Sequence, residues 1–470
     1  MTTPSFPKKI RDFLSHHFFL TTLFCCTVLS FIVYAKALTI GFLSDDWGYV
    51  YLSQHETFFH SLRFLFTPDI IGNHLGNYRP LQSILSVLTI APLYNHPELL
   101  HAVSLLLHSI VAAMAGYLTY RLFGQKRAGL FAACVFAVFP LNTEAALWLA
   151  SWNAPLALIP LLGALIIYTT PPQTKKIMYI AALAIISLLS KEYALLLPFL
   201  LFGIDLLLQR KISYRSIAAF FILDAVYLLW RIHVLGGLGG YYEGGKSISA
   251  NISLYHIVQY TTLIFGYTYG FFNRHTAPFF LGCIARIITF LTIIGIFISQ
   301  YKRKNTIFII KTVSILIFLL YASNIIGWNL VNPLDANNQH SRILYLSSVW
   351  FAILMGYLFS ITKQRILQGS FMAYLVLLCF IAYFEAQPWI QAGTSAAAIN
   401  TQVQQVLAEK PRPTKIRITN LPDEYYGAFV YRNGIDFSVA VFSHTQRNTI
   451  TVEKTMQPGI DLPIIIEHDF

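Results

Sequence analysis

The feature that most constrains this chain is a series of apolar runs, each long enough to cross a lipid bilayer. Hydrophobic residues make up 56% of the 470 residues and charged residues only 11%. So few charges do not suit an ordinary water-exposed surface. The sequence predicts an all-α polytopic membrane protein. We place about eleven spans, near residues 18–40, 101–121, 128–148, 154–170, 177–190, 193–208, 216–234, 279–299, 306–325, 343–361 and 369–387.

The net charge of +12 reports membrane topology rather than a nucleic-acid partner, because the basic residues form short clusters between apolar runs. The clusters fall on every second connection, which we expect to be cytoplasmic. They are Lys8, Lys9 and Arg11; Arg121, Lys126 and Arg127; Lys175 and Lys176; Arg210, Lys211 and Arg215; Lys302, Arg303 and Lys304; and Lys363 and Arg365. The scheme makes the short, polar run 256–272 an interfacial or re-entrant helix. It places the N-terminus in the cytoplasm and the C-terminus outside it.

Two regions are expected. Residues 1–390 form the transmembrane bundle, with a long first outer loop at 41–100, and residues 391–470 form a small extracytoplasmic domain. In the second region, KIRITNLPDEYYGAFVYRNGIDFSVAVF alternates apolar and polar residues around turn signals. This pattern predicts a β-rich appendage from about residue 413. The five cysteines lie inside apolar runs without paired spacing, so neither a disulfide framework nor a zinc site is predicted.

Charged side chains at the outer ends of the spans mark the candidate site, because charges near membrane depth are costly and usually functional. FLSDDWGYVY places the adjacent acids Asp45 and Asp46 directly after the first span. The other charged candidates are Arg79, Glu144, Lys191, Glu192, Arg231 and Arg342, and His101 and His108 share one face of the second span. Acids and bases at the outer ends of several spans are typical of a catalytic cleft at the membrane surface. A cleft of this kind suits sugar transfer from a lipid phosphate. A carboxylate takes the proton of the acceptor hydroxyl, and cations stabilise the leaving phosphate.

Each candidate also has a structural interpretation. The acidic pair is suited to cap the helix that follows, and Arg79 and Arg342 are suited to reach lipid headgroups. The others are a local turn pair of Lys191 with Glu192, an ion pair of Asp224 with Arg231, and hydrogen bonding inside the bundle for His101 and His108. The placement of all the charges on one side favours the functional interpretation.

Two other functions remain open. A transporter or lipid flippase would carry charges near the bilayer midplane and two related halves, and neither is evident in the sequence. A non-catalytic scaffold or partner subunit would leave the acidic pair as helix caps. In that case, replacing both acids would affect no reaction.

With these residues in view, the chain resembles the C-type (GT-C) polytopic glycosyltransferases that use polyprenyl-phosphate-linked sugars. It is most similar to the protein O-mannosyltransferases and to the transmembrane O-mannosyltransferases that carry tetratricopeptide repeats. The resemblance covers roughly residues 40–350 and depends on an ordered set of segments: FLSDDW, NYRPLQ, HAVSLLLHSIVAAMAGYLTYRLFG, FAVFPLNTEAALWLASWNAPLAL, SKEYALLLPFLLFGIDLL and SRILYLSS.

The resemblance implies an inverting membrane transferase with an outer-facing site and the catalytic acid in the first outer loop. By position, Asp45 would be the general base and Asp46 would orient the acceptor or headgroup, although the two are exchangeable. Arg79, Lys191 and Arg342 would bind the donor phosphate, with Glu144 and Glu192 as orienting partners. His101, His108 and Arg231 are further candidates on the orienting or acceptor side.

The chain departs from the family in two ways, since it has neither a tetratricopeptide array nor a β-trefoil insertion. A compact enzyme of the bacterial inner membrane fits better, with a protein or a cell-envelope glycolipid as acceptor. Members of the family differ in whether they need a divalent metal. No ligand set is evident here beyond the carboxylates, so the sequence leaves Mg²⁺ or Mn²⁺ open.

Overall fold

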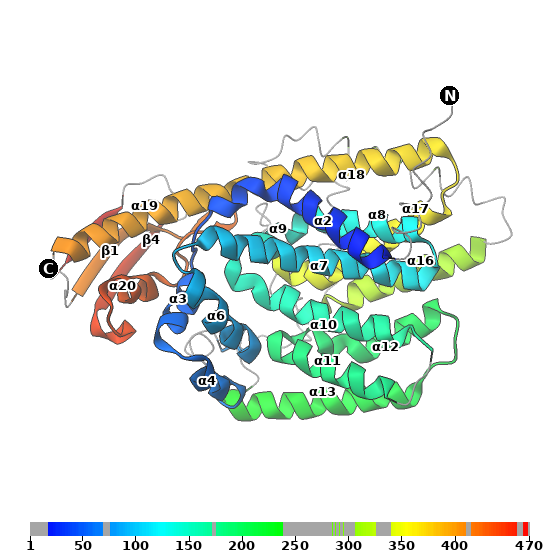
Figure 1. Ribbon diagram of the computed structural model, residues 1–470, viewed down its shortest axis with the longest axis horizontal. Helices are drawn as coiled ribbons and strands as arrows, with labels where there is room; N and C mark the ends of the chain where they lie inside the picture. Colours follow the sequence, from blue (N-terminus) through cyan, green and yellow to red (C-terminus); the bar gives the residue numbers. More distant parts are fainter. Residues whose placement is uncertain are drawn as a thin grey trace.

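The computed structural model describes residues 17–68, 76–171, 175–237, 306–325, 340–409, 415–457 and 464–468, with isolated positions at 284, 287, 291 and 295. Over these residues the chain is mostly helical, with a small sheet near its C-terminus (Figure 1). The larger helices are α2 (Phe18–Tyr34), α3 (Asp46–His55), α6 (Pro80–Leu93), α7 (Pro97–Phe123), α8 (Lys126–Ala137), α10 (Asn153–Tyr168), α11 (Lys176–Ser190), α12 (Leu197–Leu207), α13 (Tyr214–Leu235), α16 (Thr306–Ala322), α17 (Tyr345–Ile361), α18 (Arg365–Glu385) and α19 (Gln387–Glu409).

Short helices complete the helical part. They are α4 (Phe58–Ser61), α9 (Thr143–Leu147) and α20 (Ile435–Ser443), with the 3₁₀ turns η1 (Ala35–Thr39), η2 (Leu62–Leu65), η3 (Pro140–Asn142), η4 (Leu149–Trp152), η5 (Glu192–Leu196), η9 (Ser341–Leu344) and η10 (Arg447–Thr449). Several of these turns join directly onto a longer helix.

Within the described residues, six helices are long and apolar enough to cross a membrane, or seven if the bent pair α8 and α9 forms one span. Helices α6, α11 and α16 are apolar but shorter. This set suits a multi-pass membrane protein, but the expected count of about eleven spans is not confirmed. The interfacial helix expected at 256–272 lies outside the described residues, and so does nearly all of the span expected at 279–299.

A break between α8 and α9 sets the geometry of the site. Pro140 has no backbone N–H and cannot continue the hydrogen bonding of α8, and the two helical pieces meet at a bend of 56°. The bend turns α9, which carries Glu144, away from the axis of α8. The sequence-based span at 128–148 is therefore a broken one.

Close helix packing depends on small residues. A Cβ added at Gly116 of α7 would lie 2.5 Å from the carbonyl oxygen of Gly129 in α8, and a Cβ at Gly129 would lie 2.5 Å from that of Gly116. A Cβ at Gly356 of α17 would lie 2.6 Å from the carbonyl oxygen of Ala128. Glycines at these positions let three helices approach backbone to backbone, as is common inside membranes.

The C-terminal region holds a three-stranded sheet in the order β4 (Thr451–Gln457), β1 (Lys415–Pro422), β5 (Ile465–His468). Strand β1 pairs parallel with β4 and antiparallel with β5. Strands β2 (Glu424–Tyr425) and β3 (Ala428–Phe429) form a separate antiparallel pair. The β-rich expectation therefore holds for only part of this region.

The stretch DFSVAVF is not a strand but lies in helix α20. Gly434 precedes the helix in a left-handed conformation at φ +85°, and the consecutive residues Phe437 to Val441 of α20 are all buried, polar and apolar alike. A segment buried all round need not be a strand, so its residue alternation was a poor guide.

The expected domain boundary at 390/391 falls inside α19, which continues the line of α18 in Figure 1. A Cβ added at Gly393 of α19 would lie 2.4 Å from the carbonyl oxygen of Ile40. Helix α19 thus packs on the chain just before the acidic loop. Helices α3, α4 and α6 lie at the same end of the bundle as the C-terminal sheet and α20 (Figure 1).

Candidate functional site

The carboxylate of Asp46 is a buried anchor. Its two oxygens accept from separate backbone N–H groups, Oδ2 from Leu43 at 2.9 Å and Oδ1 from Ala150 at 2.7 Å. Burial raises the pKa of Asp46 well above its usual range, although these two hydrogen bonds act to lower it. Asp46 therefore ties the acidic loop to η4.

Asp45 differs from its neighbour in exposure and bonding. It occupies the N-cap position of α3, but its side chain makes no capping hydrogen bond, and the residue is only half-buried. The capping interpretation is therefore not supported for Asp45. The preceding residue, Ser44, has φ +45°, a conformation that is uncommon for a residue other than glycine.

Ala150, whose N–H donates to Asp46, is itself held by the side chains of Gln82 and Asn153. The carbonyl oxygen of Ala150 accepts from Nε2 of Gln82 at 2.8 Å and from Nδ2 of Asn153 at 2.8 Å. Asn153 also donates to Oε1 of Gln82 at 2.9 Å. Gln82 lies one turn into α6, which begins directly after Arg79. The NYRPLQ segment thus helps to place both the cationic and the acidic parts of the site.

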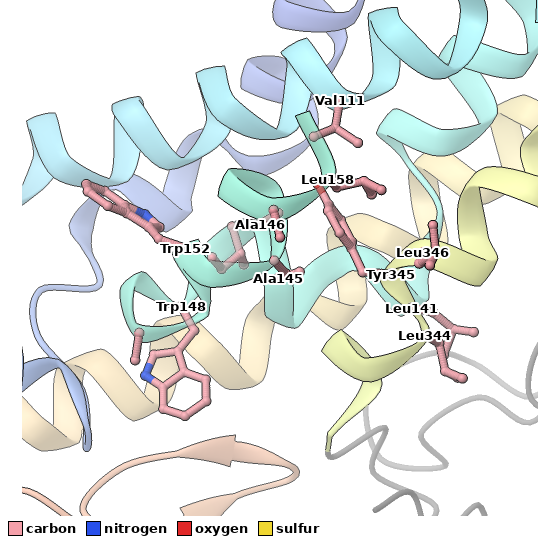
Figure 2. Close-up of a cluster of buried hydrophobic side chains, with 14 of the residues drawn as sticks. Val111, Leu141, Ala145, Ala146, Trp148, Trp152, Leu158, Leu344, Tyr345 and Leu346 are labelled. Atoms are coloured by element: carbon pink, nitrogen blue, oxygen red, sulfur yellow. The ribbon is translucent and has the colours of Figure 1, made fainter. Parts of the chain in front are cut away.

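Glu144, which is buried, and Arg342, which is partly buried, form an ion pair across the bundle. The guanidinium of Arg342 contacts Oε1 of Glu144, and its backbone N–H donates to Oε2 at 3.0 Å. The guanidinium also lies 4.8 Å from the centre of the Trp148 ring. Figure 2 shows that Trp148 points from the short α9–η4 segment towards the C-terminal strands, where its ring centre lies 4.7 Å from that of Phe429.

A second set of charges surrounds the break between α11 and η5. Nη1 of Arg231, near the end of α13, donates to Oε1 of Glu192 at 2.6 Å, and both side chains are buried. Burial opposes ionisation of Glu192, but the positive charges of Arg231 and Arg79 outweigh it and bring its pKa to about 2. Glu192 is therefore a carboxylate throughout the physiological pH range.

Lys191 joins the two sets of charges. The residue is 8% exposed, and burial lowers the pKa of its ammonium well below the usual range, as do the positive charges of Arg79 and Arg342. Its ammonium lies 4.8 Å from the ring centre of Tyr193. Nε of Arg79 is also buried, and none of the described residues offers it a hydrogen-bond acceptor. Cations that outnumber their acceptors in this way favour an anion.

One hydrogen bond joins the acidic loop to the cationic cluster. Nε1 of Trp148 donates to the carbonyl oxygen of Leu43 at 3.3 Å, while the face of the same ring lies against Arg342. The indole therefore bridges Arg342 and the loop that carries Asp45 and Asp46.

The two histidines are bonded to neutral groups. Nε2 of His101 lies 2.8 Å from the carbonyl oxygen of Gly41, just before the acidic loop. The ring nitrogens of His108 lie 2.8 Å from the Tyr345 hydroxyl and 3.0 Å from the carbonyl oxygen of Ala137. His108 is thus held inside the bundle, whereas His101 supports the start of the acidic loop.

The expected ion pair between Asp224 and Arg231 is wrong. Arg231 pairs with Glu192 instead. Seven residues of helix advance about 10 Å along the axis, which an aspartate side chain does not span easily.

Two residues of the cluster were not among the sequence-based candidates. The Tyr193 hydroxyl donates to the carbonyl oxygen of Arg342 at 3.1 Å, and Trp148 stacks on the Arg342 guanidinium. Both lie within a few residues of a predicted acid, in SKEYALL and NTEAALW. That proximity was a usable signal, but aromatic residues of membrane proteins are ordinarily assigned to interfacial belts.

The cluster carries an excess of positive charge. Its four cations are Arg79, Lys191, Arg231 and Arg342, and its two carboxylates are Glu144 and Glu192. Among the described residues, no group of three or more His, Cys, Asp and Glu side chains is placed to hold a metal ion. The arrangement is chemically suited to an anionic group next to a carboxylate.

No protein-family model matches the sequence, and no curated protein matches it. Among solved structures, the chain is similar to the crystal structure of the Archaeoglobus fulgidus oligosaccharyltransferase tethered with an acceptor peptide containing the NVT sequon. The TM-score is 0.43 and the identity 13%, over 94% of this chain. The match covers 64% of the archaeal chain, less than two thirds of its length.

Replacing Glu192 tests the electrostatic account of the cluster. In Glu192→Gln, Arg231 loses its ionised partner while buried, and we expect a loss of about 3–5 kcal/mol in the free energy of unfolding. The measurement is thermal unfolding of purified protein in detergent, in which the fraction of protein that stays monodisperse is recorded against temperature. Glu98→Gln is the matched control, because its pair with His96 is exposed. Equal stability of the two variants would contradict the account.

Proposed function

We propose that the chain is a membrane glycosyltransferase of the GT-C kind. In this proposal it transfers a sugar from a polyprenyl-phosphate-linked donor to a hydroxyl group of a protein or cell-envelope glycolipid, outside the cytoplasm. The observation that carries the proposal is the buried cationic cluster next to a loop with two carboxylates. Neither a structural ion-pair network nor a simple helix cap requires this combination.

The cationic cluster would bind the donor phosphate. A phosphodiester carries one negative charge, and with Lys191 protonated the cluster has four cations against two carboxylates. Among the described residues, Nε of Arg79 is buried without a hydrogen-bond acceptor and no carboxylate forms an ion pair with Lys191, so a phosphate oxygen would satisfy both. Glu144 and Glu192 would orient Arg342 and Arg231 rather than touch the donor.

The two acids would have different roles. Both oxygens of Asp46 already accept from backbone N–H groups, which suits an anchor and not a base. Asp45 is more exposed and makes no capping bond. We therefore assign the base to Asp45 and the positioning of the loop to Asp46.

The reaction would proceed by a single displacement. The acceptor oxygen attacks the anomeric carbon while Asp45 takes its proton, and the bond from that carbon to the phosphate oxygen breaks. The polyprenyl phosphate leaves with the bonding electrons, and its growing charge is stabilised by the cations. Attack opposite to the leaving group inverts the anomeric configuration.

The placement of the charges favours a transferase over a transporter or flippase. Arg79, Lys191 and Arg342 lie at or next to helix ends rather than in the middle of long spans. A flippase would move the lipid without forming a new glycosidic bond, so product analysis separates the two functions.

Matched aspartate variants test the assignment of the base. We expect Asp45→Asn to fold normally and to lose two or more orders of magnitude in transfer rate, since general bases typically contribute about 10²–10⁴-fold. Asp46→Asn places an amide N–H₂ against a backbone N–H, so we expect a stability loss of about 1–3 kcal/mol. The measurements are transfer of labelled sugar in membranes and thermal stability. Wild-type transfer rates in Asp45→Asn would contradict the assignment.

The lowered pKa of Lys191 predicts a pH dependence of donor binding. An anionic phosphate stabilises the ammonium, so the pKa of Lys191 rises when the donor binds, and binding takes up a proton. The affinity for the donor is therefore highest at a pH below the pKa of Lys191 in the unliganded protein, and it falls as the pH rises through that pKa. The measurement is the Kd of a sugar phosphodiester lipid against pH. Arginine stays protonated, so Lys191→Arg is expected to bind without this dependence. A wild-type Kd that is constant with pH would contradict the prediction.

A further inference from the structure

A short segment of the C-terminal region, residues 428–434, contacts both parts of the candidate site. It begins with strand β3 and ends at Gly434, directly before α20. One end of the segment lies against the cation Arg342 and the other against the acidic loop. The contact with the acidic loop links residues 389 positions apart in the sequence.

On the acidic side, the segment bonds to the backbone and side chain of Ser44. The N–H of Ser44 donates to the carbonyl oxygen of Val430 at 3.0 Å, and the Ser44 hydroxyl oxygen accepts from the N–H of Asn433 at 3.2 Å. Ser44 has φ +45°, which is unfavourable for a serine. The two bonds support this conformation immediately before Asp45.

Gly434 fits against the same serine without any side chain. A Cβ added at Gly434 would lie 2.1 Å from the carbonyl oxygen of Ser44, closer than any real contact. Gly434 also has φ +85°, which glycine adopts readily. Any other residue at this position would push the acidic loop away.

On the cationic side, the ring of Phe429 lies near two guanidinium groups. Its centre is 5.7 Å from Arg342 and 4.7 Å from Arg432. The ring also packs on Trp148, which in turn contacts Arg342. Phe429 therefore limits where the Arg342 guanidinium can lie.

We propose that the 428–434 segment is a positioning element of the transferase site, which fixes the acidic loop and Arg342 relative to each other. The inference rests on the proposed function. The segment acts through Asp45 and Arg342 and does not itself contact the reacting atoms.

The C-terminal region is also docked by contacts away from Ser44 and Arg342. Helix α20 already packs on α3 through Phe442 and Trp47, with ring centres 5.0 Å apart, and through Phe437 and Tyr51, 5.5 Å apart. The bonds to Ser44 are additional, and they are placed next to the proposed base.

The first test compares two glycine variants that share the same backbone penalty. Gly434→Ala pushes on Ser44, whereas Gly124→Ala, at φ +71°, has nothing within 4 Å of the new methyl group. We expect Gly434→Ala to lower kcat about 10- to 100-fold per folded molecule, since a displacement of about 1 Å has that effect, with little change in the KM for the donor. Gly124→Ala should keep the wild-type kcat.

The second test is Phe429→Leu, which keeps an apolar side chain but removes the ring beside Arg342. We expect the KM for the polyprenyl-phosphate donor to rise about three- to tenfold, as loss of a partly buried cation–π contact predicts, with a smaller change in kcat. General unfolding would instead lower the amount of active enzyme and leave KM unchanged.

The outcomes separate this inference from the proposed function. If the wild type transfers sugar and both variants behave like Gly124→Ala, the positioning role is wrong while the transferase proposal stands. If the wild type neither transfers sugar nor binds a polyprenyl phosphate, the proposed function fails, and the positioning role fails with it. A lowered kcat in Gly434→Ala together with a raised KM for the donor in Phe429→Leu would support both the positioning role and the transferase proposal.

Discussion

The incomplete neutralisation of a buried charge cluster is the constraint on which the site depends. Arg231 and Arg342 are each paired with a glutamate, but no described carboxylate pairs with Lys191, whose pKa is lowered by burial and by neighbouring positive charges. Holding extra cations out of water is costly. The packing of the rest of the bundle has to offset this unfavourable free energy. An anionic ligand would reduce it on binding.

The fold produces this cluster by ending or breaking helices at one end of the bundle. Pro140 interrupts α8 and turns Glu144 inward, α11 ends immediately before Lys191, and α6 begins just after Arg79. Each break releases backbone groups and side chains from regular helix geometry. The 428–434 segment of the C-terminal region then contacts Arg342 of this cluster and Ser44 of the acidic loop.

The sequence was a good guide to which charges meet and a poor guide to how they pair. Placing acids and bases at the ends of apolar runs was enough to group Arg79, Glu144, Lys191, Glu192 and Arg342, because the bilayer forces such ends into one layer. The partner of Arg231 was not predictable, because it lies on another helix whose rotation depends on packing. The helix at α20 and the different environments of Asp45 and Asp46 likewise depend on tertiary contacts. The catalytic and binding roles stay predictions.

The most direct test of the central claim is equilibrium binding of a polyprenyl-phosphate sugar and of the matching uncharged polyprenol to the protein in nanodiscs. The account predicts that the phosphate lipid binds at least tenfold more tightly and that Arg79→Gln, which removes a partly buried cation without breaking a glutamate pair, abolishes most of this preference. Equal binding of the two lipids, or an unchanged preference in Arg79→Gln, would contradict it.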